Sequence, residues 1–172
     1  MKVVILSVNN QREIIEHFIS YGYDDFVVFN GKKEISENDM KYYSLNGIRI
    51  VQIKRAEGED TSFSLSKIKG SLTKRFFLVY SWDICFTDID RALAIHKSSQ
   101  VIATLIQING NKSFISAAIF EEELFDYVSL NKRLEGDVLK ELCGDMELTI
   151  INYNERGCRI NNLALSKNKN KK

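Results

Sequence analysis

The chain of 172 residues contains no proline, whereas average usage of about 5% would give roughly 8 or 9. This absence excludes proline-rich linkers and PxxP docking segments. It also leaves the turns to Gly, Asn, Asp and Ser. The apolar fraction of 44% and the charged fraction of 27% are ordinary, so they exclude disorder, collagen and a disulfide-stapled mini-protein. The composition therefore indicates a globular protein.

Cysteine and long apolar runs are also scarce. The three cysteines, Cys85, Cys143 and Cys158, are odd in number and far apart, and no CxxC pair exists. This spacing excludes a zinc ribbon or a redox motif and favours reduced thiols in a cytoplasmic protein. No run of 18 apolar residues exists, so no membrane span is predicted. The start, MKVVILSVNN, has no small-residue cleavage site and is interpreted as a strand rather than a signal peptide.

Neither sign of charge is in large excess, because 24 basic and 23 acidic residues give a net charge of +1. Four lysines lie within residues 166–172, and without them the rest of the chain carries −3. No basic face is indicated, and no nucleic-acid partner is predicted. We predict one domain over residues 1–165 and a disordered Lys/Asn-rich tail over residues 166–172.

Predicted strands and helices alternate along the chain. Apolar, β-branched runs predict strands at residues 2–8, 25–29, 48–53, 75–80, 101–108, 113–120 and 147–152. Helices are predicted from Asn10 to Gly22, after Asp88 or Asp90, and at 35–43, 63–72, 121–128 and 134–142. The alternation predicts an α/β fold with a Rossmann-like, mostly parallel sheet and helices on both faces. Ligands bind beyond the carboxyl ends of such strands, so a site is expected in the loops after Val8, Phe29, Ile53 and Tyr80.

Several stretches, taken in order, resemble those of one family. Residues 1–6 are similar to an opening strand M-K-A-V-I-L, and residues 14–31 to a helix followed by Y-G-x-x-D-F-I-I. Residues 76–97 resemble a strand ending in Y-G-D, then D-x-D and a helix closing with F-H-K, and residues 117–127 resemble G-G-F-F-V-x-x-x-V-F-D-Y. The family is that of the sugar-1-phosphate nucleotidyltransferases, with the glucose-1-phosphate cytidylyltransferases as the most similar branch. The resemblance covers nearly the whole chain and implies that family's core without its active-site insertions.

The resemblance implies a reaction in which a sugar phosphate attacks the α-phosphate of a nucleoside triphosphate, with Mg²⁺ and release of pyrophosphate. It implies nucleotide-binding positions at Ser7, Arg12, Thr61 and Trp82. The family's glycine-rich loop follows the first strand, but the segment from Ser7 to Arg12 has no glycine to let backbone N–H groups approach a triphosphate. Arg12 is either a substitute cation or a solvent-facing residue of the first helical turn.

Two further parts of the implied nucleotide site are altered. Thr61 to Ser66 stands at the family's base-recognition turn, T-G-G-R-L-K, and Phe63 replaces a glycine there. Its benzyl group is expected to occupy space where a nucleobase approaches the backbone. Trp82 replaces the glycine of Y-G-D, and its indole either fills the vacated nucleotide pocket or stacks on a base.

The resemblance places Mg²⁺ at Asp83 and Asn162. Asp83 is the nearest match to the carboxylate of Y-G-D, and its alternative role is to cap a turn or helix. Asn162, or the adjacent Asn161, stands where the family has a second metal-binding Asp, and a neutral amide adds no charge to attract Mg²⁺. The family's E-K-P segment, whose lysine contacts the sugar phosphate, has no counterpart between Ile108 and Ser113.

These losses predict a non-catalytic relative, a pseudoenzyme with a binding or regulatory role in nucleotide-sugar and surface-polysaccharide biosynthesis. Its ligand is expected to be a nucleotide or nucleotide sugar, and its partner a second copy of the chain or a full-length paralogue. The alternative is an active, Mg²⁺-dependent sugar-1-phosphate cytidylyltransferase. A third interpretation, a different Rossmann-like protein, would be supported by a different strand order. The two histidines, His17 and His96, lie on predicted helices without a nearby nucleophile and are expected to be structural.

Overall fold

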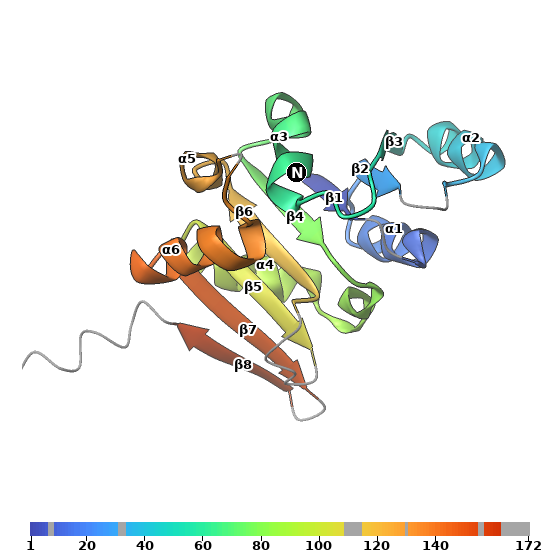
Figure 1. Cartoon of the computed structure of the whole chain (residues 1–172). Coiled ribbons are helices and arrows are strands. Elements are labelled where there is room, and N and C mark those ends of the chain that lie inside the picture. The colour runs from blue at the N-terminus through green and yellow to red at the C-terminus, as the bar shows by residue number, and fades with distance from the viewer. Residues whose placement is uncertain (7–8, 31–33, 109–114, 130, 155–156, 163–172) are drawn as a thin grey trace, which may run out of the picture.

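The computed structural model describes residues 1–6, 9–30, 34–108, 115–129, 131–154 and 157–162. These residues form one eight-stranded sheet with the order β3-β2-β1-β4-β6-β5-β7-β8 (Figure 1). The strands are β1 (Lys2–Ile5), β2 (Asp25–Asn30), β3 (Arg49–Lys54), β4 (Arg75–Val79), β5 (Ala103–Ile108), β6 (Ala117–Glu121), β7 (Leu148–Asn154) and β8 (Gly157–Asn162).

Most of the strands run in the same direction. The pairs β1/β2, β1/β4, β2/β3 and β5/β7 are parallel, which confirms the predicted mostly parallel sheet. Two strands run the other way: β6 lies between β4 and β5 and is antiparallel to both, and β8 is antiparallel to β7. The carboxyl ends of β1, β2, β3, β4, β5 and β7 therefore meet at one edge of the sheet, which we call the carboxyl edge.

Helices cover both faces of the sheet, as predicted (Figure 1). The α-helices are α1 (Gln11–Ser20), α2 (Glu37–Leu45), α3 (Thr61–Ile68), α4 (Ile89–Ser99), α5 (Leu124–Tyr127) and α6 (Leu139–Gly144). The short 3₁₀ helices η1 (Lys69–Ser71) and η2 (Trp82–Phe86) and a π-helical turn, η3 (Leu134–Val138), complete the described helical elements. None of these helices has the length and apolarity that crossing a membrane requires.

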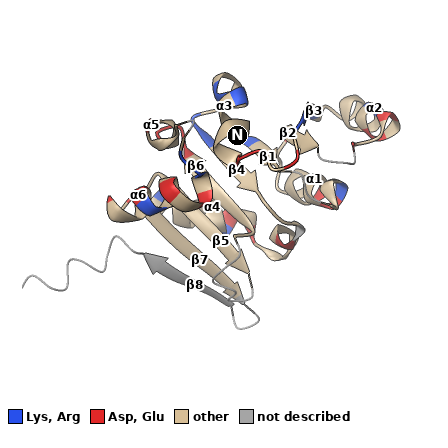
Figure 2. Ribbon diagram, viewed as in Figure 1, with Lys and Arg blue, Asp and Glu red and all other residues tan. Residues whose placement is uncertain are grey.

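The strands separate two apolar cores. Side chains of α1, α2 and α4 pack on one face with Val3 and Ile5 of β1, whereas those of α3, α5, η3 and α6 pack on the other face with Val4 and Leu6. This alternation follows from the two-residue period of a strand. Figure 2 shows the complementary pattern, in which charged residues lie mainly on the helices and connections. Continuous apolar runs thus form strands because both faces of the sheet are covered.

Short polar side chains fix several helix starts. Asp60 accepts a hydrogen bond from the Ser62 amide at 2.8 Å, and Asp88 accepts one from the Arg91 amide at 3.0 Å. Each bond satisfies an amide that the first helical turn leaves unpaired. Asn10, the cap expected for α1, instead has a left-handed backbone at φ 66° and makes no side-chain cap bond. Asparagine tolerates that conformation better than most residues, which explains its place in this turn.

The structure corrects several predicted boundaries. Helix α3 begins at Thr61 rather than at residue 63, because the Asp60 cap adds its first turn. The segment at 134–142 is π-helical before it becomes α-helical, and the helix expected at 121–128 is only the four residues of α5. Neither η2 nor β8 was predicted. The predicted tail, residues 166–172, and the turn at Asn109–Gly110 lie outside the described residues.

Candidate ligand-binding site

A cavity of about 950 Å³ opens at the carboxyl edge, beyond β3. It is lined by Arg55, Ala56, Glu57, Gly58, Glu59, Asp60 and Thr61 from the β3–α3 loop, and by Arg133, Glu135 and Gly136 from the start of η3. The loop after Ile53 was one of those in which a site was predicted. The cavity therefore lies where parallel α/β sheets bind their ligands.

The β3–α3 loop is shaped by hydrogen bonds to one arginine. The guanidinium of Arg55 donates to the carbonyl oxygen of Glu59 at 2.6 Å and to the hydroxyl of Thr61 at 3.4 Å. Gly58 has a φ of +75°, a left-handed conformation that suits glycine and lets the loop turn back. Arg55 is consequently engaged in holding the loop that forms one wall of the cavity.

Glu59 also has a structural task. Its carboxylate accepts hydrogen bonds from the Ser64 hydroxyl and from the Lys67 ammonium, both at 2.7 Å. Burial by itself would raise the pKa of the Glu59 carboxyl, but these bonds outweigh it, and the pKa lies below its ordinary value. These bonds favour the ionised form of Glu59, which ties the loop to α3.

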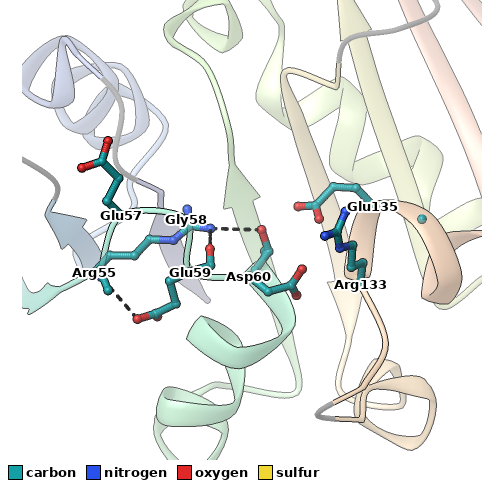
Figure 3. A pocket seen from close by; sticks show the side chains of 10 residues that line it. Arg55, Glu57, Gly58, Glu59, Asp60, Arg133 and Glu135 are labelled. Atoms are coloured by element: carbon teal, nitrogen blue, oxygen red, sulfur yellow. Dashed lines mark hydrogen bonds between the residues drawn. The ribbon is translucent and has the colours of Figure 1, made fainter.

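Three charged side chains converge across the cavity. Figure 3 shows Asp60 from the β3–α3 loop pointing toward Arg133 and Glu135, while Glu57 points elsewhere. The ion pairs of the described residues include neither Arg133 nor Glu135. The Arg133 guanidinium therefore has no ion-pair partner among the described residues, whereas the Glu135 carboxylate interacts with the Tyr80 phenol.

Tyr80, which follows β4, adds a buried hydroxyl beside this cluster. Its oxygen is shielded from solvent and interacts with the Glu135 carboxylate. Burial raises the pKa of the Tyr80 phenol well above its ordinary value, and the nearby carboxylates of Glu135 and Asp60 raise it further. The phenol is therefore a neutral hydrogen-bond donor at ordinary pH.

The cavity carries an excess of negative charge. Its described lining contains four carboxylates, on Glu57, Glu59, Asp60 and Glu135, and two guanidiniums, on Arg55 and Arg133. Because Lys67 pairs with Glu59, three carboxylates remain against the two guanidiniums. A triphosphate needs the opposite balance, because its charge must be neutralised by cations and oriented N–H groups. This lining disfavours a polyphosphate.

Two of the sequence-predicted nucleotide residues have described side chains, Thr61 and Arg12. Thr61, which is 5% exposed, lines the cavity. Arg12 lies on the exposed side of α1 and pairs with Glu16 at 2.8 Å and Asp39 at 3.7 Å, so it takes the solvent-facing role. Ser7 lies outside the described residues, as does the side chain of Trp82, so neither interpretation of its indole is tested.

Phe63 does not occupy the cavity as expected. It lies on α3, is 46% exposed and is not among the lining residues. The Lys67 ammonium lies 4.6 Å from the centre of its ring, an exposed cation–π contact. Because α3 begins at Thr61, position 63 falls within its first turn, where the side chain can face solvent.

The two predicted Mg²⁺ ligands do not fit a shared site. Asp83 lies in η2, beyond the carboxyl end of β4, and η2 contacts α1, where the Cys85 thiol donates to the Glu13 carbonyl at 3.7 Å. Asn162 ends β8 and pairs with Thr149 near the amino end of β7. The two residues therefore lie at opposite edges of the sheet, which the length of β7 separates. Among the described residues, moreover, no three His, Cys, Asp or Glu side chains are grouped to hold a metal ion.

His96 belongs to a buried network at the opposite edge of the sheet. Its Nδ1 lies 2.8 Å from the Thr104 hydroxyl and its Nε2 lies 3.2 Å from a carboxylate oxygen of Glu121. Arg75 forms an ion pair with that carboxylate. Burial lowers the pKa of His96, although Glu121 opposes the shift. The neutral ring donates from Nε2 to Glu121 and accepts at Nδ1 from Thr104, which fits the structural role predicted for it.

Sequence reasoning missed most of the cavity. Arg55, Glu59 and Asp60 belong to the polar stretch before α3, and that stretch followed a strand whose carboxyl end was expected to bind ligand. Arg133 and Glu135 had no such signal, because they precede a helix far along the chain. Only the packing of η3 against α3 brings them to the cavity.

Comparisons with known proteins identify the fold. No protein-family model and no curated protein matches the sequence. A glucose-1-phosphate thymidylyltransferase from Bacillus anthracis, described as putative and solved with a sucrose, matches with a TM-score of 0.62 and 10% identity over 97% of this chain and 91% of that chain. HddC from Yersinia pseudotuberculosis matches with a TM-score of 0.59 and 9% identity over 98% of this chain and 96% of that chain. A nucleotide-diphospho-sugar transferase from Desulfovibrio desulfuricans G20, also described as putative, matches with a TM-score of 0.53 and 11% identity over 89% of this chain and 80% of that chain.

These likenesses define a class of fold. The chain has the Rossmann-like α/β fold seen in sugar nucleotidyltransferases, over nearly its whole length. The third interpretation, a different Rossmann-like protein, is not supported, because the fold matches these structures. Identities of 9–11% establish the fold alone, and the cytidylyltransferase branch is not singled out by them.

Proposed function

We propose that this protein, which has a nucleotidyltransferase fold, binds a ligand but does not transfer nucleotides. The ligand belongs to nucleotide-sugar or surface-polysaccharide biosynthesis and is a nucleotide, a nucleotide sugar or a sugar. The observation that carries the proposal is the charge of the carboxyl-edge cavity, where three carboxylates remain against two guanidiniums once Glu59 is paired with Lys67. Nucleotidyl transfer depends on neutralising developing phosphate charge, and this cavity provides the wrong sign.

The other cations offer no compensation. Arg12 is the basic residue nearest in sequence to the position of the family's glycine-rich loop, and it is paired with Glu16 and Asp39. Arg55, the last basic residue before α3, donates to its own loop. The stretch from Asn9 to Arg12 contributes no glycine. Together these features support binding without transfer.

Thermal-shift measurement on the full chain tests the binding half of the proposal. Nucleotide sugars, sugars, sugar 1-phosphates and the four nucleoside triphosphates are compared with and without Mg²⁺. A ligand at 100 times its Kd adds about 2.7 kcal/mol to stability and gives a clear shift in Tm. We expect a shift with at least one sugar-containing ligand, and no dependence of that shift on Mg²⁺. No shift with any member would contradict a ligand-binding role.

The alternative is an active, Mg²⁺-dependent sugar-1-phosphate cytidylyltransferase that uses Asp83. One observation favours it: Asp83 lies just beyond the carboxyl end of β4, and its carboxylate forms no ion pair or hydrogen bond with another described residue. This alternative requires that CTP and Mg²⁺ bind together and that Asp83→Ala abolish that binding. Calorimetric titration of CTP and Mg²⁺ into the parent protein and into Asp83→Ala tests this alternative.

The partner is part of the same proposal. A binding protein with this fold acts as a homo-oligomer or on a full-length paralogue that retains the catalytic loops. Sedimentation of the chain alone, and then with such a paralogue, tests this. A monomer that does not change the paralogue's sedimentation or turnover would argue against a regulatory role.

A further inference from the structure

Strand β3 forms an open edge of the sheet, because among the described residues it pairs with β2 alone. The Arg49 amide donates to the Asp24 carbonyl oxygen at 2.7 Å, so the odd-numbered residues of β3 bond to β2. Backbone groups alternate in direction along a strand, and the N–H and C=O groups of Ile50, Gln52 and Lys54 therefore point away from the sheet. These groups have no backbone partner in the described part of the chain. A further strand can be added at this edge.

Exposed apolar side chains flank the β3 edge on both faces of the sheet. Helix α2 and β3 lie side by side at one end of the molecule (Figure 1). On α2, Tyr42 and Leu45 are one helical turn apart and are 59% and 78% exposed. On the other face, Val51 of β3 lies beside the core residue Val27 and is itself exposed. Grouped exposed apolar residues mark interaction surfaces, so this end of the molecule is suited to docking.

The β3 edge carries a cation at each end and no acidic residue. The Arg49 side chain is 65% exposed, and its guanidinium lies 3.8 Å from the Asp25 carboxylate, which already holds the Lys2 ammonium at 3.0 Å. Lys54 is exposed and takes part in no ion pair of the described residues. Charge complementarity therefore favours an acidic occupant of the edge.

A second copy of the chain is a poorer match for this edge. Antiparallel pairing of β3 with its own copy about a two-fold axis brings Arg49 of one copy toward Lys54 of the other. Like charges across a strand pair are destabilising, and charged edge strands are a common defence of sheets against self-association. The same two cations attract an acidic strand, so they select between the two occupants.

We propose that β3 binds an extended, acidic segment of a partner protein, which adds a strand to the open edge of the sheet. Its backbone bonds to the outward groups of β3, its acidic side chains pair with Arg49 and Lys54, and its apolar side chains cover Val51. The inference goes beyond the proposed function, because it concerns the sheet edge rather than the cavity, and either one can fail without the other.

Isothermal titration calorimetry of the full chain with three peptides tests the inference. The probes are acetyl-EVTVTE-amide, its basic counterpart acetyl-KVTVTK-amide, and acetyl-EVTPTE-amide, whose proline interrupts strand pairing. We expect the acidic peptide to bind about tenfold more tightly than the basic one, and the proline peptide not to bind. No binding of the acidic peptide, or equal binding of the acidic and basic peptides, overturns the inference. Equal binding of the two acidic peptides also overturns it, because charge alone would then explain the affinity.

A substitution in β3 locates the binding at the edge. Ile50→Pro removes an outward N–H and leaves the bonds to β2 in place, so it should abolish binding of the acidic peptide. Ile50→Ala is the matched control, because it loses the same side chain but keeps the N–H, and it should bind as the parent chain does. Equal binding by the two variants would overturn strand addition.

The charge argument has a variant that does not depend on the fold of β3. Lys54→Glu should weaken binding of acetyl-EVTVTE-amide by about threefold or more. Lys140→Glu on α6 is the control, because Lys140 is also exposed and its affinity should equal that of the parent chain. Equal affinities of these two variants would overturn the inference. A dimer of the parent chain that Ile50→Pro dissociates would make a second copy the occupant and would overturn it as well.

Discussion

Asp83 and Asn162, the two positions where the family resemblance implies metal ligands, lie at opposite edges of the sheet. Asp83 follows the carboxyl end of β4, whereas Asn162 pairs with Thr149 near the amino end of β7. The seven-residue strand β7, at about 3.3 Å per residue, separates these two edges. A single Mg²⁺ cannot contact both, because its bonds to oxygen are only about 2 Å long.

Mg²⁺ should therefore leave the protein unaffected. We expect the same Tm in Mg²⁺ and in EDTA, and the same ligand affinity in both. Asp83→Ala should have the same Tm and the same ligand affinity as the parent protein, because one partly exposed carboxylate is a weak magnesium site. A calorimetric Mg²⁺ signal that disappears in Asp83→Ala would support the active alternative instead.

The wall of the cavity should depend on the cap of α3. Asp60 accepts from the Ser62 amide, so Asp60→Ala should lower the free energy of unfolding by about 1 kcal/mol. Asp60→Asn keeps the capping oxygen, so its free energy of unfolding should be close to that of the parent protein. Urea denaturation measures both. Equal losses in the two variants would show that the carboxylate charge, rather than the cap, stabilises the helix.

The ion pair between Lys2 and Asp25 should be needed for stability. The Lys2 side chain is 2% exposed, and its ammonium lies 3.0 Å from the Asp25 carboxylate. Asp25→Ala leaves a buried charge without its partner, which should cost at least about 2 kcal/mol in urea denaturation. The control is Arg12→Ala, which removes an exposed pair and should leave stability unchanged. Similar losses of stability in Asp25→Ala and Arg12→Ala would show that the Lys2 ammonium is hydrated rather than buried.

Stability should fall in mild acid because of His96. Its pKa in the folded protein is below the ordinary value of 6.5, so the unfolded chain binds more protons as the pH drops below about 6.5. The stabilisation is complete above that pH and is lost as the pH falls toward the folded-state pKa. Glu121 opposes the shift, whereas Arg75 and Lys97 add to it.

Urea denaturation between pH 5 and 8 measures this dependence, which for one proton is at most about 1.4 kcal/mol per pH unit. His96→Asn should flatten the curve. Burial also lowers the pKa of His17, so a smaller slope of the same sign should remain. A slope that is unchanged in His96→Asn would assign the acid sensitivity to another group.

The sequence was informative where residue patterns are local. Apolar runs such as Phe26–Phe29 and Phe76–Val79 predicted buried strands, because a covered parallel sheet needs apolar side chains on both faces. The family resemblance led to the expected fold, and the loop after Ile53 proved to line the cavity. The insertion of β6 between β4 and β5 was not predicted, because strand order depends on long-range pairing.

The site was less predictable than the fold. Thr61 was found because it stands at a family motif, but Arg133 and Glu135 reach the cavity only through the packing of η3 on α3. Tyr80 was read as the end of a strand. Its buried hydroxyl interacts with Glu135, a contact between residues far apart in the chain that no sequence pattern records.

The central claim is that this nucleotidyltransferase fold does not transfer nucleotides. Its most direct test is pyrophosphate release from each of the four nucleoside triphosphates with glucose 1-phosphate and Mg²⁺, with an active sugar-1-phosphate nucleotidyltransferase as the positive control. We predict no release above the protein-free blank. Release at about 1 s⁻¹ or faster, lost in Asp83→Ala, would contradict the claim and establish the active alternative.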